Sequence, residues 1–391
     1  MFCLILSEMH QKTKTEGEYS KITDEEYLGA TKLEKAEDPE DENIGVLTKF
    51  WRSKGWLICS IIASACFGVA SFFMGEVSRN GIVAKNLLSL GFMIISIIYM
   101  VIAFTLNYFN GIRIWSFRDN DCVFEDENGV KRFHWSYFIG MILSSLGNVV
   151  GTYFVAMTFQ YSEQAGVNQG VMSTLFVLSA IFCAIFAYIF LNEIMGGADY
   201  VGMLFMIACA VLLSLSQVGT DEGEITGGIN KERISAFIPV LAATGSSLGF
   251  GVRSVLIKYF VMKGYNVYNF AMQSLFVDGL IGTIYLIIQY ITVDGLITQQ
   301  ILIPGVLSGL IAGFGTFLIN YSISVGIAGP ASAMANLAAV FQTILDYFIL
   351  GQVLNLLQIL GLLIGLIGAI VLAVGASIFV GMVELFKPKQ D

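Results

Sequence analysis

Ten apolar runs, each long enough to cross a membrane, constrain this chain more than any other feature. A transmembrane helix needs roughly 20 consecutive apolar residues. Such runs recur from Trp56 onward, at about residues 56–75, 87–108, 136–158, 169–191, 198–217, 234–260, 267–291, 303–325, 329–350 and 356–381. The runs are continuous rather than alternating, which is typical of helices and not of a membrane barrel. The sequence therefore predicts an all-α polytopic membrane protein with ten transmembrane helices.

The composition agrees with lipid as the solvent of these runs. Of the 391 residues, 56% are hydrophobic and 13% are charged, whereas roughly a quarter of a soluble domain is charged. Both histidines, His10 and His134, lie outside the runs. This excludes a histidine-based metal site within the membrane, and we expect no metal and no other cofactor. Four of the six cysteines fall inside apolar runs, so we expect no disulfide framework either.

Polar segments divide the chain into five parts. Residues 1–48 are mostly polar and charged, which predicts a disordered acidic tail. Residues 55–217 and residues 233–381 each hold five apolar runs. Between these halves lies a polar connector, residues 218–232, and a short polar tail, residues 382–391, ends the chain.

Lysine and arginine in the short flanks of the runs indicate the orientation in the membrane. Eleven of them lie on the side of the N-terminus, whereas the other side holds only Arg79, Lys85, Lys231 and Arg233. Cytoplasmic flanks carry the excess of positive charge. We therefore expect both termini in the cytoplasm, together with the loop of residues 109–134, which reads as a solvated hairpin. The membrane is the plasma membrane or an endomembrane.

The second half of the chain repeats the first. One register aligns the first and sixth runs and pairs identical residues, namely Phe67-Gly68-Val69 with Phe250-Gly251-Val252, Gly81 with Gly264, and Asn86 with Asn269. Later identities are Gly151-Thr152 with Gly315-Thr316, Phe182 with Phe341, Leu191 with Leu350, Gly202 with Gly361, and Ala210 with Ala369. Because each half holds five spans, an odd number, the second half must enter the membrane from the opposite side. The sequence thus predicts two inverted five-helix repeats.

Inverted repeats have a mechanical use in transporters. Two nearly equivalent packings of the same parts give outward-open and inward-open states of similar energy, with a substrate site near the middle of the membrane. The repeat therefore favours a carrier that works by alternating access. The alternative interpretation is that the duplication is only a relic of how the fold arose.

The ends of the fourth and ninth runs carry further family signals. The segment FAYIFLNE closes the fourth run at Glu193, and LDYFILGQ closes the ninth at residues 345–352. Together with the two repeats, these segments resemble EamA-type carriers of the drug/metabolite transporter superfamily over roughly residues 55–380. The resemblance implies ten helices, alternating access and a central cavity lined by helices one to four and six to nine. Helices five and ten are then peripheral packing elements or the contact of a homodimer.

The chain departs from the pattern of these carriers at two places. Gln352 stands where an acidic residue often closes the ninth helix. The proline that is common midway along the fourth and ninth helices is absent, and Val177 and Asn336 lie near those positions. The usual cause of a bend in these two helices is therefore missing.

Three ionisable residues fall inside the runs. A charge at the centre of a spanning helix costs at least roughly 2.5–3.5 kcal/mol, so each calls for a partner or a function. Arg253 and Asp278 lie at similar depths, about 14 and 17 Å from the same membrane face at 1.5 Å per residue, and we expect them to meet. This pair either lines a cavity, where it binds an anionic group, a cation or a coupling proton, or forms a structural ion pair. Asp346 lies nearer its helix end and is expected to reach interfacial water.

Uncharged polar residues occur at mid-depth as well. They are Asn148, Asn320, Tyr321, Asn336 and Gln342. An amide in a membrane usually makes an interhelical hydrogen bond. As a set, however, these residues lie on helices that the resemblance assigns to the cavity, and they would suit a polar organic solute. With Arg253 and Asp278, they are our predicted substrate-binding residues.

Glycines at four-residue spacing mark two packing faces. They are Gly305, Gly309 and Gly313 in the eighth run, and Gly361 and Gly365 in the tenth. Small residues at this spacing let a neighbouring helix approach closely. Packing is the expected role of both faces, and in the tenth helix the partner is either this chain or another protomer.

These observations favour a secondary transporter of a small polar organic solute or metabolite. No motif of a phosphate-binding loop, a zinc protease or a nucleophile elbow occurs, so we do not expect an enzyme. The main alternative is a non-transporting membrane subunit or scaffold that retains the carrier fold. The expected partners of the protein are the small-molecule solute and membrane lipid, and we expect no nucleic acid.

Overall fold

The computed structural model describes residues 46–77, 82–109, 123–125, 131–165, 175–193, 195–218, 235, 237–293, 297–350, 356–357, 359–368 and 370–371. The chain separates into two compact units, Met1–Ser53 and Lys54–Asp391, and the account below concerns the second. Nearly all of the predicted acidic tail, the connector after Val218, the C-terminal tail and Gln352 lie outside the described residues.

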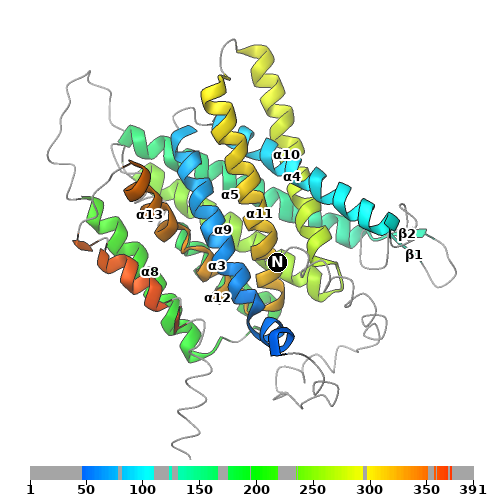
Figure 1. Ribbon diagram of the computed structural model, residues 1–391, viewed down its shortest axis with the longest axis horizontal. Coiled ribbons are helices and arrows are strands. Elements are labelled where there is room, and N and C mark those ends of the chain that lie inside the picture. Colours follow the sequence, from blue (N-terminus) through cyan, green and yellow to red (C-terminus); the bar gives the residue numbers. More distant parts are fainter. Residues whose placement is uncertain are drawn as a thin grey trace, which may run out of the picture. The chain divides into compact units, whose positions relative to one another are not determined.

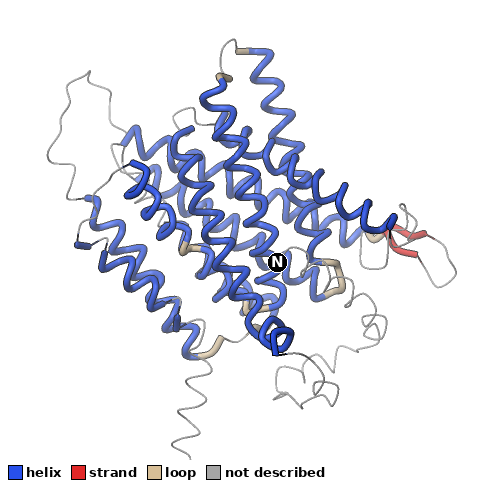
Figure 2. Tube along the Cα trace, in the orientation of Figure 1, coloured by secondary structure: helices blue, strands red, loops and turns tan. Residues whose placement is uncertain are grey.

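The described part of the chain is almost entirely helical (Figures 1 and 2). Its helices are α3 (Val46–Val77), α4 (Ile82–Phe109), α5 (Trp135–Ala165), α7 (Leu178–Leu191), α8 (Gly197–Val218), α9 (Phe237–Met262), α10 (Val267–Thr292), α11 (Gln299–Val325), α12 (Ala328–Ala335) and α13 (Ala338–Leu350). A 3₁₀ turn, η4 (Leu175–Val177), precedes α7. A further helical segment covers residues 359–368. The only strands described are β1 (Val123–Glu125) and β2 (Lys131–Phe133).

Among the described residues, seven helices are long and apolar enough to cross a membrane. They are Gly55–Gly75, Val83–Thr105, Trp135–Ser162, Phe237–Met262, Val267–Thr292, Gln299–Val325 and Ala328–Ile349, the last of which includes the short turn between α12 and α13. Three shorter apolar helices, Leu175–Leu191, Gly197–Cys209 and Ile359–Gly368, fall where the fourth, fifth and tenth spans are predicted. The chain is thus a polytopic helical membrane protein, while the number of ten spans stays a prediction.

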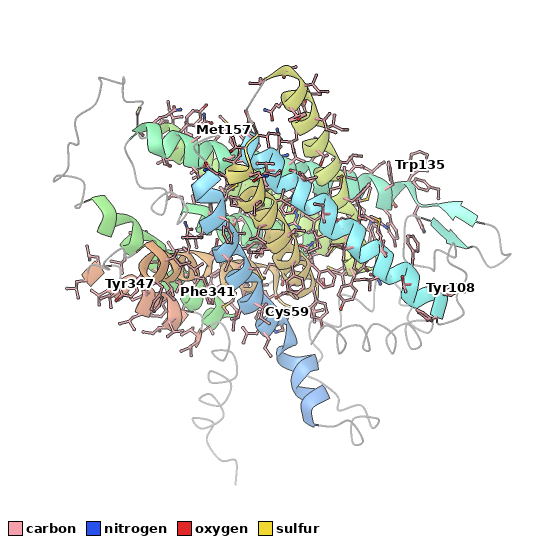
Figure 3. The ribbon with its side chains drawn as sticks, turned by 45° about the horizontal axis from the view of Figure 1, so that its top comes forward. Cys59, Tyr108, Trp135, Met157, Phe341 and Tyr347 are labelled. Atoms are coloured by element: carbon pink, nitrogen blue, oxygen red, sulfur yellow. The ribbon has the colours of Figure 1, made fainter. Side chains whose placement is uncertain are left out.

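The long loop predicted as a hairpin does contain one. β1 and β2 pair antiparallel, with Val123 opposite Phe133. Next to the strands, Trp135 at the start of α5 and Tyr108 at the end of α4 point outward (Figure 3), and both side chains are exposed. Aromatic residues gather at the boundary between lipid and water, so these two rings indicate where the membrane ends on this side.

Glycines let α4 and α11 approach closely. A β-carbon added at Gly305 would lie 2.7 Å from the β-carbon of Leu87, and one at Gly313 would lie 2.6 Å from Ile95 Cγ2. At Gly309, an added β-carbon would overlap the carbonyl oxygen of Leu88. The glycine face predicted in the eighth span is therefore a packing face, and its neighbour is α4.

Replacing Gly309 by alanine is expected to destabilise the protein by about 1–3 kcal/mol, the usual cost of overpacking a core. The reason is that the new methyl group meets backbone rather than a side chain that could turn away. Thermal melting of the purified protein in detergent measures the effect. Gly197→Ala is the matched control, because a β-carbon there has nothing within 4 Å. Equal melting temperatures for the two variants would contradict the close approach.

The two helices that lack the expected proline differ from a regular α-helix near the positions of Val177 and Asn336. α7 follows the 3₁₀ turn that ends at Val177, and the ninth span breaks between α12 and α13 at Asn336 and Leu337. The amide of Asn336 donates to Ser332 O at 2.9 Å, and Ser64 Oγ donates to Met334 O at 2.6 Å. Side chains thus satisfy carbonyls near the break, which an intact helix would bond to its own backbone.

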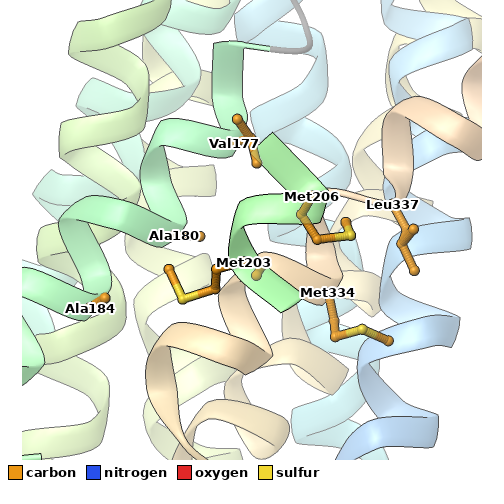
Figure 4. Packing of buried hydrophobic residues seen from close by; sticks show 8 residues of the cluster. Val177, Ala180, Ala184, Met203, Met206, Met334 and Leu337 are labelled. Carbon is orange, nitrogen blue, oxygen red and sulfur yellow. The ribbon is translucent and has the colours of Figure 1, made fainter. Parts of the chain in front are cut away.

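A hydrophobic cluster lies around the 3₁₀ turn before α7 and the break after α12 (Figure 4). Its buried members are Val177, Ala180, Ala184, Met203, Met206, Ala333, Met334 and Leu337. They come from η4, α7, α8 and α12 and from the turn after α12. The flexible methionines fill the irregular space that the broken helices leave.

The C-terminal helical segment packs on α8, and the two lie side by side in Figure 1. A β-carbon added at Gly365 would lie 2.7 Å from Cys209 Sγ, and one at Gly368 would lie 2.9 Å from the β-carbon of Phe205. Of the two partners predicted for the glycines of the tenth span, the structure places Gly365 against this chain.

Candidate functional site

Asp278 is the centre of a buried polar cluster between α4, α5 and α10. Its side chain is fully buried. The carboxylate forms an ion pair with Lys85 Nζ at 3.4 Å and accepts hydrogen bonds from Ser89 Oγ at 3.0 Å and from Asn148 Nδ2 at 2.5 Å. α4 and α5 belong to the first half of the chain and α10 to the second, so both halves contribute to this cluster.

Lys85 does not lie where the sequence predicts it, in the flank of the second span. α4 begins at Ile82, so Lys85 belongs to the helix, and its side chain is only 4% exposed. Its position relative to Ser89 is the signal that could have found it. Residues four apart lie on one face of a helix. In a helix that starts before Lys85, the side chains of Lys85 and Ser89 therefore face the same neighbouring helix.

Arg253 on α9 is also buried, but its partner is not the one predicted. Its Nη2 donates to Asn320 Oδ1 of α11 at 3.0 Å. Within the described part of the chain Arg253 forms no ion pair, and Asp278 acts on its charge only across a longer distance. The expected Arg253–Asp278 pair is therefore wrong. The depth of a residue along a helix does not give its direction around the helix, and Asp278 faces α4 instead.

Two donors beside this hydrogen bond have no partner. Arg253 Nε and Asn320 Nδ2 are both buried and unbonded. The Arg253 side chain lies near the middle of α9, where Gly147 and Gly249 let α5 approach closely. The site thus holds a buried positive charge and hydrogen-bond donors that protein atoms do not satisfy.

The other predicted site residues have different surroundings. Tyr321 stacks on Tyr268 with 5.8 Å between ring centroids. Asn336 bonds within its own helix, at the break after α12. Gln342 is buried in α13. Of the five uncharged residues predicted, the hydrogen bonds thus bring Asn148 and Asn320 to the charged groups. The side chain of Asp346 lies outside the described residues.

A second ion pair links the ends of α7, α11 and α12 to Lys258 near the end of α9. Lys258 Nζ of α9 bonds to Glu193 Oε1 at 2.9 Å and donates to Gly326 O at 2.8 Å. Glu193 Oε1 also accepts from Ala328 N at 3.1 Å. Asn192, in the left-handed conformation with φ of 51°, ends α7 and turns the chain toward this contact. We call this group the Glu193–Lys258 bridge.

The described residues contain no group of three histidine, cysteine, aspartate or glutamate side chains that could hold a metal ion. Cys59, Cys66, Cys183 and Cys209 are free thiols. The Asp278 and Arg253 sites themselves consist of charged side chains and of amide and hydroxyl hydrogen-bonding groups.

Comparisons with known proteins identify a family for part of the chain. Residues 237–374 match the EamA-like transporter family, which confirms over that stretch the resemblance seen in the sequence. A search of curated proteins found no match. A solved structure described as "Crystal structure of protein" covers 81% of this chain and 98% of its own length, with 14% sequence identity and a TM-score of 0.56. At that identity the likeness concerns the fold alone.

Proposed function

We propose that this chain, whose residues 237–374 match the EamA-like transporter family, is a secondary transporter of a small polar organic solute. The observation that carries the proposal is the buried polar cluster around Asp278, to which both halves contribute. Charged groups inside a membrane protein are costly and usually mark a solute or ion pathway. A family of transporters also favours a carrier over an enzyme.

Packing between the halves supports two inverted repeats. A β-carbon added at Gly68 would lie 2.6 Å from the β-carbon of Phe341, and one at Gly251 would lie 2.8 Å from the β-carbon of Phe182. The predicted register pairs Gly68 with Gly251 and Phe182 with Phe341. Each contact therefore has its counterpart once the halves are exchanged.

A glycine in the third helix of each half makes a second pair of equivalent contacts. An added β-carbon at Gly151 would lie 2.7 Å from the ring of Phe250, and one at Gly315 would lie 3.1 Å from the ring of Phe67. The register pairs Gly151 with Gly315 and Phe67 with Phe250. In addition, the register that pairs Phe182 with Phe341 pairs Val177, the end of the 3₁₀ turn before α7, with Asn336, where the ninth span breaks. Such exchange is what a two-fold relation between the halves requires.

The polar residues break this pseudo-symmetry. In the same registers, Asp278 corresponds to Ile95 and Asn148 to Ala312. Equivalent places in the other half are thus occupied by apolar residues, so the fold itself does not require a charge there. This asymmetry supports a role for the cluster in binding or coupling rather than in building the repeat.

In the proposed mechanism, the two halves rock around the polar residues and expose them to each side in turn. The candidate residues in order of support are Arg253, Asp278, Asn148 and Asn320, followed by Tyr321, Asn336 and Gln342. The first four share a hydrogen-bond network or a neighbouring charge at mid-depth. The proposal also includes cytoplasmic N- and C-termini and a homodimer that forms through the fifth and tenth helices.

Uptake by the purified protein in liposomes tests the proposal. A panel of radiolabelled metabolites is offered to proteoliposomes and to protein-free liposomes, and a carrier accumulates at least one solute in a saturable way. Saturation separates a carrier from a leak. Well-folded protein that moves none of the panel, and whose melting temperature no solute raises, would favour the scaffold instead.

A further inference from the structure

Arg253 carries a buried charge that the described protein does not balance. Its side chain is 5% exposed. The other three charged residues buried in the described part of the chain are Lys85, Asp278 and Asp199. Lys85 and Asp278 balance each other, and Asp199 bonds Gly196 N at the start of α8. Arg253 is thus left with a neutral partner, Asn320, and a net positive charge remains. An uncompensated buried charge is expensive, so an anion that arrives with the substrate is the natural counter-charge.

The unsatisfied donors define what kind of anion fits. Nε of Arg253 and Nδ2 of Asn320 belong to side chains that already touch through Nη2 and Oδ1. They can therefore point to one group with two acceptor atoms. A carboxylate offers two such oxygens and a single negative charge, which matches one guanidinium. A phosphate ester at neutral pH carries about 1.5 to 2 negative charges and would leave an excess negative charge in the site.

The repeat argues that these two residues are not needed for folding. In the registers that align the halves, Arg253 corresponds to Ala70 and Asn320 to Ala156. Both alanines are buried. A small apolar side chain is therefore sufficient at the equivalent place, so the guanidinium and the amide are free to serve a purpose other than folding.

We infer that Arg253 and Asn320 bind the carboxylate of a small monoanionic organic solute, with one oxygen accepting from Arg253 Nε and the other from Asn320 Nδ2. This inference rests on the proposed transport function for its biological meaning, but binding alone tests it. Asp278, already paired with Lys85, does not take part in recognising the carboxylate.

The test compares acids with their amides. Purified protein in detergent is melted with lactate or lactamide, benzoate or benzamide, and nicotinate or nicotinamide. At least one carboxylate is expected to raise the melting temperature while its amide does not, because a ligand that binds the folded state stabilises it. Phenyl phosphate is melted with the protein in the same way, to compare a phosphate ester with the carboxylates. Equal shifts for acid and amide, no shift with any carboxylate, or a larger shift with the phosphate would overturn the inference.

Variants assign the effect to the two residues. Arg253→Gln should weaken carboxylate binding about tenfold to a hundredfold, the worth of a charged hydrogen bond. Ser254→Ala is the matched control, since Ser254 bonds Phe250 O of its own helix and the side chain of Cys183. Asn320→Asp is the sharper variant. It supplies the missing charge internally, so we expect a higher melting temperature without ligand and no shift with carboxylates. Undiminished carboxylate shifts in Arg253→Gln or in Asn320→Asp would contradict the assignment.

Uptake into proteoliposomes separates the two proposals. If amides and carboxylates enter at equal rates, transport stands and the carboxylate site is wrong. If carboxylates raise the melting temperature but no solute enters, the site stands and the transport function is wrong.

Discussion

Replacing Asp278 by alanine is expected to lower the free energy of unfolding by about 3–5 kcal/mol, because breaking a buried ion pair leaves a charge without a partner. The charge in question is that of Lys85, which is almost fully buried. Ser89 and Asn148 would lose their acceptor as well. The melting temperature in detergent and the yield of monodisperse protein measure the loss.

A double variant tells whether the loss comes from the ion pair. Replacing both partners, in Lys85→Met with Asp278→Leu, should recover most of the stability, since an apolar pair of similar size often substitutes for a buried salt bridge. Asp199→Ala is the control for a buried acid without an ion pair, and it should cost about 1 kcal/mol, the worth of a helix cap. Stable Asp278→Ala protein, or a double variant no better than the single one, would contradict the pairing. Uptake by a well-folded double variant would show that the pair serves stability alone.

Cross-linking the Glu193–Lys258 bridge should stop transport almost completely. The bridge joins α7 of the first half to α9 and the α11–α12 junction of the second. If the halves rock, these helix ends must separate in one of the two states. Cysteines at both positions, in a Cys183→Ala background, are joined by a short bifunctional methanethiosulfonate reagent, and uptake is followed before and after reduction of the link.

Reversal by reduction and two variants, each with one of the two introduced cysteines in the same background, control this experiment. Each single variant should transport equally with and without the reagent, because it forms no link between helices. The repeat also predicts that the opposite end has no such ion pair, since Gln352 corresponds to Glu193 and Gly75 to Lys258. Full transport by the linked protein would mean that this end stays closed throughout, which excludes it as a gate.

The fold was predictable where long-range periodicity carries the information. The length of the apolar runs predicted the seven long helices that can cross a membrane in the described part of the chain. The glycine spacing in the eighth span predicted the packing face that meets α4. The break at Asn336 could not be predicted, because the proline that usually bends this helix is absent. Its surroundings include a hydrogen bond from Ser64 Oγ to Met334 O, and Ser64 lies far away in the sequence.

The sequence indicated which polar residues belong to the candidate site, but not which of them contact one another. Arg253, Asp278, Asn148 and Asn320 were found because a polar group in an apolar run needs a reason. Their partners depend on the rotation of each helix about its axis, which composition and depth do not fix. Lys85 was missed because its apolar run begins two residues later, although the helix itself begins earlier. The Glu193–Lys258 bridge joins two helix ends that are distant in sequence.

The orientation of the two halves is the claim on which the carrier mechanism depends, and cysteine labelling from each side of the membrane measures it directly. Ser136 and Gln299 are both exposed and lie at the start of the third helix of their half, α5 and α11. One cysteine is introduced at either position in protein whose Cys3 and Cys122 have been replaced. A membrane-impermeant maleimide is then added before and after permeabilisation of the membrane. We expect Ser136→Cys to react only from the side of the termini and Gln299→Cys only from the other side. Labelling of both from the same side would mean that the halves are parallel.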